Sequence, residues 1–321
     1  MEKTKTCRRG LKRLLAFLLS ALCLLGLLPM SAFAMEPGQT ASSWLGDQYV
    51  GSDGQHYYSP APYTYLVYNS DGTMDVRTSS GGSAYRHYML TVSDGSSHQV
   101  YCVESGIPYN TSDNTYTSES GTNSQYLNLL PAEARRGITL TAIYGWKPGA
   151  SLPVSGINED DYKMATQIIL WEYQQQLRSD PYSRHGNGHA SADQYYSVIA
   201  GRPAEKAYNW ILEQVASHST VPSFTSSSKD GAPELELKWD SEQRVYTLTV
   251  TDTNNLGIDL DLLSGSGVSV TRNGNQYTFT SKDMIMDPVT FEFRKDIPVA
   301  NDMLIWGRPG YQTMMTGASD P

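Results

Sequence analysis

The first pattern along the chain is a set of short runs rich in tyrosine, valine and leucine, separated by polar residues. Residues 63–68 and 88–92 are two such runs, and a short polar turn separates the second from a third at 98–103. Runs of this length and composition predict β-strands, and the short turn predicts a hairpin. Residues 35–58 are polar and glycine-rich, and the polar residues 110–124 are expected to form a loop. The N-terminal part is therefore expected to be β-rich.

Helical signals take over in the middle of the chain. A helix is expected to begin at Pro131, because proline suits the first turn, and to stop at Gly145. Asn158 is a good N-cap for a second helix running to Arg178, and acidic residues follow it where the helix dipole favours them. A third helix is expected near Pro203. The apolar face of the second helix consists of Met164, Ile168 and Trp171.

The pattern changes again after a linker at 221–231 that is rich in serine, proline and glycine. From residue 232 onward, apolar and polar residues alternate in several short runs, and the dipeptide Asn273-Gly274 is a typical hairpin turn. Alternation over many short segments predicts a second, all-β domain with a sandwich-like arrangement.

The first 34 residues have the features of a signal peptide. Six basic residues precede the apolar stretch 14–28, and Ala32-Phe-Ala34 supplies small residues for cleavage before Met35. The apolar stretch is shorter than the roughly 20 residues that span a bilayer, and Pro29 closes it. We therefore expect an exported protein, at the bacterial cell surface or extracellular, with no membrane span after cleavage.

Charge argues against nucleic acid as a partner. Removing the signal peptide takes six of the 24 basic and one of the 33 acidic residues, which leaves 18 and 32 and a net charge of about −14. A surface this acidic repels phosphates.

The candidate chemistry is carried by a cysteine and a glutamine. Cys102 is the one cysteine left after residue 34, and an unpaired thiol is unusual in an exported protein. Gln167 lies in the middle of the second predicted helix. Attack of a thiolate on the glutamine carboxamide, with loss of ammonia, would give an internal thioester. This requires the two groups to be held roughly 3 to 3.5 Å apart and shielded from water.

These residues carry a family resemblance. The segments Tyr101-Cys102-Val103-Glu104 and 166–171, Thr-Gln-Ile-Ile-Leu-Trp, resemble the two signatures of thioester domains in Gram-positive surface adhesins. The resemblance covers roughly 63–218, and it includes the segment that ends Ala-Ile-Tyr-Gly-Trp at residue 146. One departure is Ile169, where many members have alanine, and it concerns packing more than chemistry.

The resemblance implies a covalent adhesin. Its internal thioester would form spontaneously between Cys102 and Gln167, and a lysine amine on a host surface or extracellular-matrix protein would then attack Gln167. Tyr101, Leu170 and Trp171 would shield the bond. The reaction is single-turnover, so we do not expect an enzyme, and we expect no catalytic residue, cofactor or metal.

Together these observations predict an α+β protein. A thioester domain at 35–220, with a β-rich portion packed on a helical portion, would follow the signal peptide at 1–34. The linker 221–231 would lead to a sandwich-like domain at 232–321.

Two other function classes remain open. A cysteine peptidase or acyl transferase would use Cys102 as nucleophile and a histidine as base, but Cys102 does not begin a helix, where reactive thiols are commonly activated. A noncovalent protein- or carbohydrate-binding module would leave Cys102 and Gln167 unreacted. The candidate bases are His87, His98, His189 and His218.

Three further features of the sequence say less about function. His185 and His189 have a spacing seen in metal ligands, but no third ligand is evident. Lys295 is in phase with the apolar positions of its strand and Lys238 is not, and we expect no Lys-Asn or Lys-Asp crosslink. The last six residues contain neither a sorting motif nor an apolar tail.

Overall fold

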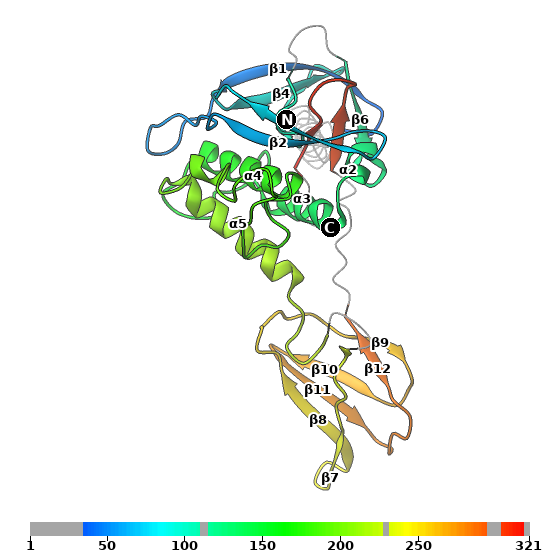
Figure 1. The fold of residues 1–321 in the computed structure, drawn as a ribbon. Coiled ribbons are helices and arrows are strands. Elements are labelled where there is room, and N and C mark those ends of the chain that lie inside the picture. Colours follow the sequence, from blue (N-terminus) through cyan, green and yellow to red (C-terminus); the bar gives the residue numbers. More distant parts are fainter. Residues whose placement is uncertain (1–34, 110–114, 227–230, 294–302, 318–321) are drawn as a thin grey trace, which may run out of the picture.

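The fold is described from a computed structural model, in which residues 35–109, 115–226, 231–293 and 303–317 are placed. The predicted signal peptide and Lys295 lie outside these ranges. The described chain has two parts, one built of a barrel and helices and the other of strands alone (Figure 1). This arrangement confirms the predicted α+β class, with a β-rich portion packed on a helical portion and a separate all-β part.

The first part is built on a closed antiparallel barrel. Its strands are, in order around the barrel, β1 (Thr40–Gln48), β4 (Arg86–Val92), β5 (Ser97–Cys102), β14 (Met314–Met315), β13 (Leu304–Gly307) and β6 (Tyr116–Ser120). The ring closes where β6 pairs with β1. A separate hairpin consists of β2 (Tyr63–Tyr68) and β3 (Met74–Ser79). Closure leaves the barrel without an unpaired edge.

The barrel corrects one expectation from the sequence and contains one strand for which there was no prediction. Residues 110–124 were expected to be a loop, yet they contain β6, and the polar segment 35–58, for which no element was predicted, contains β1. Both are barrel strands in which buried and exposed residues alternate, although the buried positions include small or polar side chains such as Ser43 and Ser118. A strand that buries serine gives a weak hydrophobic pattern.

Helices cover one side of the barrel (Figure 1). The main ones are α3 (Ala132–Tyr144), α4 (Glu159–Gln174) and α5 (Ala204–Ser219), with the short α2 (Gln125–Leu129) and the 3-10 turns η1 (Gly121–Asn123) and η2 (Tyr196–Val198). All three main helices pack on one another, and α4 also packs on β5. Every residue of α4 from Asp161 onward is buried. A helix that is buried on all sides is held rigidly, which matters for the residue it carries at its centre.

The helix boundaries follow their local signals. Asn158 caps α4 through a reciprocal capping box with Asp161, as the N-cap prediction requires. The helix was expected to continue to Arg178 but ends at Gln174. Gln176 adopts a positive φ of 55°, which breaks the right-handed helix.

The second part contains two sheets. One has the strand order β10 (Ser269–Asn273), β11 (Gln276–Ser281), β8 (Val245–Thr251) and β7 (Lys238–Asp240), and the other pairs β12 (Thr290–Glu292) with β9 (Asp261–Ser264). Phe279 of the first sheet and Phe291 of the second meet edge to face, with ring centroids 5.3 Å apart. The aromatic contact joins the two sheets into a sandwich-like unit.

The C-terminal segment differs from the predicted domain limits. Residues 303–317 were assigned to the second domain, but β13 pairs with β6 and β14 pairs with β5, so both strands belong to the barrel. Their residues are buried on both faces and form continuous apolar runs without alternation. The second domain is therefore inserted between α5 and β13.

Candidate functional site

Cys102 and Gln167 meet between the barrel and α4. The backbone N–H of Cys102 donates to Gln167 Oε1 at 2.9 Å, and Gln167 Nε2 donates to the Cys102 carbonyl at 2.7 Å. Both residues are fully buried. The two hydrogen bonds fix the carboxamide beside the residue that carries the thiol, so the structure brings the predicted pair together.

This contact also has an electronic consequence. A donor on Oε1 stabilises the negative charge that this oxygen would develop if a thiolate attacked the carboxamide carbon. The donor is the backbone of Cys102 itself. The attacking thiol and the N–H that would stabilise the developing charge therefore both belong to Cys102.

The Cys102 thiol is strongly protected from ionisation. Burial raises its pKa to about 12, partly offset by the Trp171 indole and the Glu104 backbone N–H, which favour the thiolate. The Glu104 N–H donates to the sulfur at 3.4 Å. The Trp171 N–H has no regular hydrogen bond with a described residue. Because a thiolate is the attacking species, the raised pKa slows reaction of this thiol with reagents at neutral pH.

The three residues predicted to shield the bond are all buried, but they occupy different places. Trp171 lies beside the sulfur, and its ring is flanked by the rings of Tyr85 and Tyr195 at 5.2 and 5.3 Å. Leu170 is fully buried on α4. Tyr101 points to the helices, where its hydroxyl donates to the Trp146 carbonyl at 2.8 Å. Of the three, Trp171 has the position that shielding requires.

A known protein family matches the part of the chain that holds this pair. Residues 99–217 match the family model described as "TED: Thioester domain", a range that contains both Cys102 and Gln167. This part of the chain is similar to thioester domains. A solved structure, the thioester domain of the Staphylococcus aureus TIE protein, matches with 14% sequence identity and a TM-score of 0.39, covering 88% of this chain and 94% of that one. No curated protein sequence matches the chain significantly.

Contacts between α4 and its neighbours fix the position of Gln167. Gly145, just after α3, allows close approach to α4, since a Cβ there would lie 2.4 Å from Thr166 Cγ2. The Thr166 hydroxyl accepts from the Trp146 N–H at 2.9 Å. Because Thr166 precedes Gln167, these contacts set the position of the reacting carboxamide.

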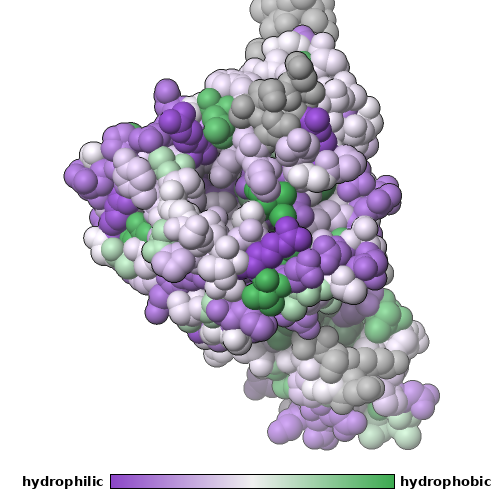
Figure 2. Space-filling model, turned by 45° about the horizontal axis from the view of Figure 1, so that its top comes forward, coloured by the Kyte–Doolittle hydropathy of each residue, from purple (hydrophilic) through white to green (hydrophobic). Residues whose placement is uncertain are grey.

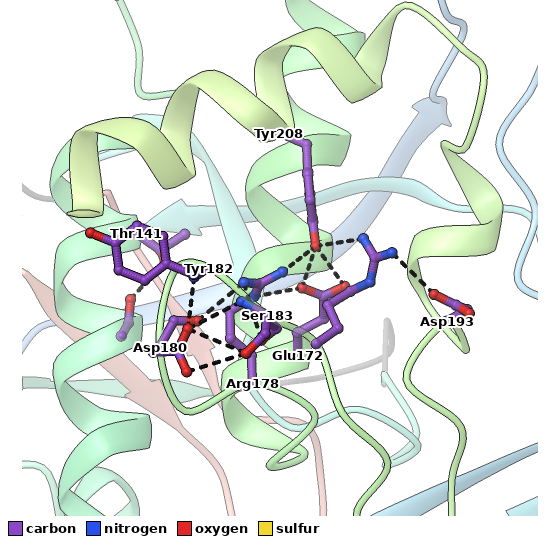
Figure 3. A network of polar contacts seen from close by, with 10 residues as sticks. Thr141, Glu172, Arg178, Asp180, Tyr182, Ser183, Asp193 and Tyr208 are labelled. Carbon is purple, nitrogen blue, oxygen red and sulfur yellow. Dashed lines mark hydrogen bonds and ion pairs between the residues drawn. The ribbon is translucent and has the colours of Figure 1, made fainter. Parts of the chain in front are cut away.

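A buried polar network fastens the other end of α4 (Figure 3). Glu172 forms an ion pair with Arg178 at 3.0 Å and accepts a hydrogen bond from the Tyr208 hydroxyl of α5. Burial raises the pKa of Glu172, and Arg178 opposes this rise. Glu172 follows Trp171 directly, so the network holds the helix turn that shields the sulfur.

The C-terminal strand β14 supports Cys102 from the other side. Met314 of β14 lies opposite Cys102 of β5, and the Val103 N–H donates to the Thr313 carbonyl at 3.0 Å. The Glu104 carboxylate in turn accepts from the Thr313 N–H and hydroxyl, both at 2.9 Å. The family model ends at residue 217. Thr313 and Met314 therefore lie outside the matched range, and no local pattern around them predicts this supporting role.

A cavity of about 470 Å³ lies next to Trp171. Its wall is largely aromatic and comes from the barrel, the segment after Cys102 and the η2 region. Tyr63, Tyr85, Tyr88 and Tyr195 are also near enough for a Cys102 thiolate to raise their pKa values. The aromatic residues of the wall are Tyr63, Tyr85, Tyr88, Tyr109, Trp171 and Tyr195. The cavity thus approaches the buried sulfur from the outside, with Trp171 between them.

The histidines considered as bases are engaged elsewhere or exposed. His87 contacts Asp160 at 2.9 Å, His98 contacts Ser96 and His218 contacts Tyr144 at 2.6 Å, while His189 is exposed. None of them is among the groups that shift the pKa of Cys102. The described ranges contain no cluster of three or more metal-ligating side chains. Within the same ranges, no helix is both long and apolar enough to cross a membrane.

Proposed function

We propose that this protein is an exported surface adhesin that forms a Cys102–Gln167 thioester and uses it to bond covalently to lysine amines of a host surface or matrix protein. The observation that carries the proposal is the pair of hydrogen bonds between the Gln167 carboxamide and the Cys102 backbone, within the range that matches the thioester domain family.

Thioester formation exchanges one bond for another. The Cys102 sulfur adds to the Gln167 carboxamide carbon, the C–N bond breaks, and nitrogen leaves as ammonia with the thiol proton. The buried Cys102 N–H stabilises the oxygen during this addition. Burial then keeps water from the product.

In the bonding to a target, the Cys102 sulfur changes from nucleophile to leaving group. A neutral amine adds to the same carbon, the C–S bond breaks, and the proton released by the amine converts the leaving thiolate to the Cys102 thiol. The product is an amide between Gln167 and the target lysine. Since Gln167 is consumed, the protein acts once and is not an enzyme. The proposed reaction requires neither metal nor cofactor.

Intact mass spectrometry tests the first step. The purified wild-type protein should be one ammonia lighter than its sequence, and the variants Cys102→Ala and Gln167→Ala should have their full masses. Methylamine should then add to Gln167 and release one titratable thiol at Cys102 per amine. A wild-type protein of full mass, with Gln167 unmodified after methylamine treatment, would exclude the thioester. A noncovalent binding module would then be the better reading.

The same experiment distinguishes the thioester protein from a cysteine peptidase. A peptidase thiol is alkylated by iodoacetamide before any amine is added, because its thiolate is present at neutral pH. The thioester protein should be alkylated only after amine treatment. The raised pKa of Cys102, and the absence of an imidazole among the groups that shift it, support the second outcome.

A further inference from the structure

The Gln167 carboxamide takes the place of a missing strand beside Cys102. The pairing of β4 with β5 ends where Tyr88 lies opposite Val100, two residues before Cys102. On the other side, β5 is bonded to the C-terminal segment through Val103, and neighbouring residues of a strand point their N–H and C=O groups to opposite sides. The N–H and C=O of Cys102 therefore point to the side that β4 leaves unpaired. There Gln167 accepts from the N–H and donates to the C=O.

The same two-point pairing occurs twice more among the described residues. In each case the amide oxygen of a glutamine accepts from the backbone N–H of a strand residue, and the amide nitrogen donates to the C=O of that residue. The pairs are Gln175 with Leu66, at 2.5 and 3.0 Å, and Gln194 with Thr64, at 3.0 and 2.7 Å. Both strand residues belong to β2, whose sheet has two strands. This fold thus uses a carboxamide as a substitute for a strand, and at Cys102 the strand residue also carries a thiol.

Formation of the proposed thioester removes one half of this pairing. Oε1 of Gln167 keeps the Cys102 N–H, but Nε2 leaves as ammonia, so the Cys102 carbonyl loses the donor that it has at 2.7 Å. Both residues are fully buried, and a buried C=O that loses its donor is unfavourable. The thioester form therefore has an acceptor beside its reactive carbon that a new N–H group would satisfy.

An attacking amine meets this acceptor. Thioester formation and attack by an amine both pass through a carbon that bears oxygen, sulfur and nitrogen, so the amine adds from the side on which ammonia left. Its nitrogen then lies where Nε2 was, next to the Cys102 carbonyl. The amine has also left water to reach a fully buried carbon, so its N–H groups need acceptors in the protein. The Cys102 carbonyl is placed to be one of them.

We propose that the Cys102 carbonyl selects primary amines, such as an unmodified lysine, over secondary amines, such as N-methyl-lysine. The inference rests on the proposed thioester and specifies which amines it accepts. A primary amine has two N–H groups. One donates to the carbonyl, and the other gives its proton to the Cys102 sulfur as the C–N bond forms and the C–S bond breaks. A secondary amine has a single N–H, which cannot do both.

The molecular surface makes such selection at the carbon useful. Figure 2 shows the barrel end of the molecule, where hydrophobic residues are scattered among pale and hydrophilic ones. Among the described residues that this view shows, no continuous apolar patch would hold one kind of amine by its carbon chain. On this face, discrimination between amines of similar size is left to the groups beside the reacting carbon.

The test compares two isomeric amines on the wild-type thioester protein. Ethylamine and dimethylamine have the same atoms, but ethylamine has two N–H groups and dimethylamine has one. Rates are followed by adduct mass and thiol release, and each rate constant is divided by that of the same amine with a glutamyl thioester of a short peptide in solution. This division removes the intrinsic reactivity of the amines. We expect the normalised rate constant of dimethylamine to be about tenfold below that of ethylamine, as the loss of one hydrogen bond implies.

A second pair of compounds extends the comparison to lysine. Nα-acetyl-lysine N-methylamide should react about tenfold faster than its Nε-methyl analogue after the same division, for the same reason. The carbonyl itself can also be observed, because Cys102 is the one cysteine after residue 34. Cysteine labelled with ¹³C at its carbonyl places a single label there. In infrared spectra the labelled band should lie at higher wavenumber in the thioester form than in the Cys102–Gln167 form regenerated by ammonia.

The outcomes separate this inference from the thioester itself. If the wild type lacks the ammonia-loss mass, the proposed function fails, and the inference about amine selection fails with it. If the thioester forms and reacts with ethylamine, but dimethylamine has the same normalised rate constant, the inference alone is wrong. A carbonyl band at the same wavenumber in both forms would also overturn it, because the Cys102 carbonyl would then keep a donor in the thioester.

Discussion

Met314 lies directly opposite Cys102 in the barrel, although 212 positions separate them along the chain. β14, which carries Met314, contributes one of the two neighbouring strands of β5 and the Thr313 contacts to Val103 and Glu104. A chain that ends at residue 302 would therefore lose support on one side of the cysteine. We expect this truncation to abolish the ammonia-loss mass and to make Cys102 reactive toward iodoacetamide at neutral pH. Retention of the full mass deficit would show that β14 is dispensable.

The crosslink should stabilise the folded protein. A bond between Cys102 and Gln167 closes a loop of 65 residues, which would restrict the unfolded chain by about 4 kcal/mol if it behaves as a disulfide does. Gln167→Ala should lower the free energy of unfolding in urea by about that amount. Methylamine-treated wild type is the control, because it loses the crosslink without a substitution and should be destabilised similarly. A loss confined to the variant would be due to packing.

The raised pKa of Cys102 predicts how the alkylation rate of its free thiol depends on pH. In Gln167→Ala the thiol stays free, and its pKa of about 12 means that only a small fraction is thiolate at neutral pH. The alkylation rate should rise about tenfold per pH unit from pH 7 to pH 10 without reaching a plateau, because each unit increases the thiolate fraction tenfold below the pKa. A plateau near pH 8 or 9 would contradict the burial effect.

Trp171→Phe separates the shielding ring from its N–H. The indole favours the thiolate of Cys102, so phenylalanine should raise the pKa of the thiol while still covering the bond. We expect the ammonia-loss mass to develop about fivefold more slowly during refolding, as the loss of one weak hydrogen bond implies, but to reach the same final level. An unchanged rate would limit Trp171 to shielding. Hydrolysis during storage should stay as slow as in the wild type.

Arg178→Ala tests the network that holds the end of α4. Glu172 is fully buried, and removing its partner leaves the carboxylate unpaired, which should lower the free energy of unfolding by about 3 kcal/mol at pH 7. Because burial raises the pKa of Glu172, the carboxyl is protonated in the folded state at higher pH than in the unfolded state. The deficit should therefore shrink as pH falls. Arg77→Ala, which breaks an exposed pair with Asp75, is the control and should have no measurable effect.

Local signals accounted for the elements that position the pair. Asn158 predicted the start of α4, and Pro131 and Gly145 predicted the limits of α3, because caps and helix breakers act on their immediate neighbours. The short apolar run ending at Cys102 predicted β5 for the same reason. With Gln167 in mid-helix and Cys102 at a strand end, the sequence supplied both partners of the contact.

The pairing of strands far apart in the sequence had no local signal. β13 and β14 are short runs whose role depends on β6 and β5, almost 200 or more positions earlier, and nothing in their own residues specifies those partners. The residues that line the cavity beside Trp171 also come from segments far apart in the sequence. The cavity therefore forms only when the barrel is closed.

The insertion of the second domain also sets an order of events during synthesis. The chain is made from its N-terminus, so β5 and α4 emerge before the inserted domain and before the two strands that close the barrel. Cys102 therefore gains its last neighbouring strand only after the inserted domain has been made. Completion of the cysteine's surroundings thus follows synthesis of the inserted domain, and a chain that stops before β13 lacks the closed barrel in which the thioester would be protected.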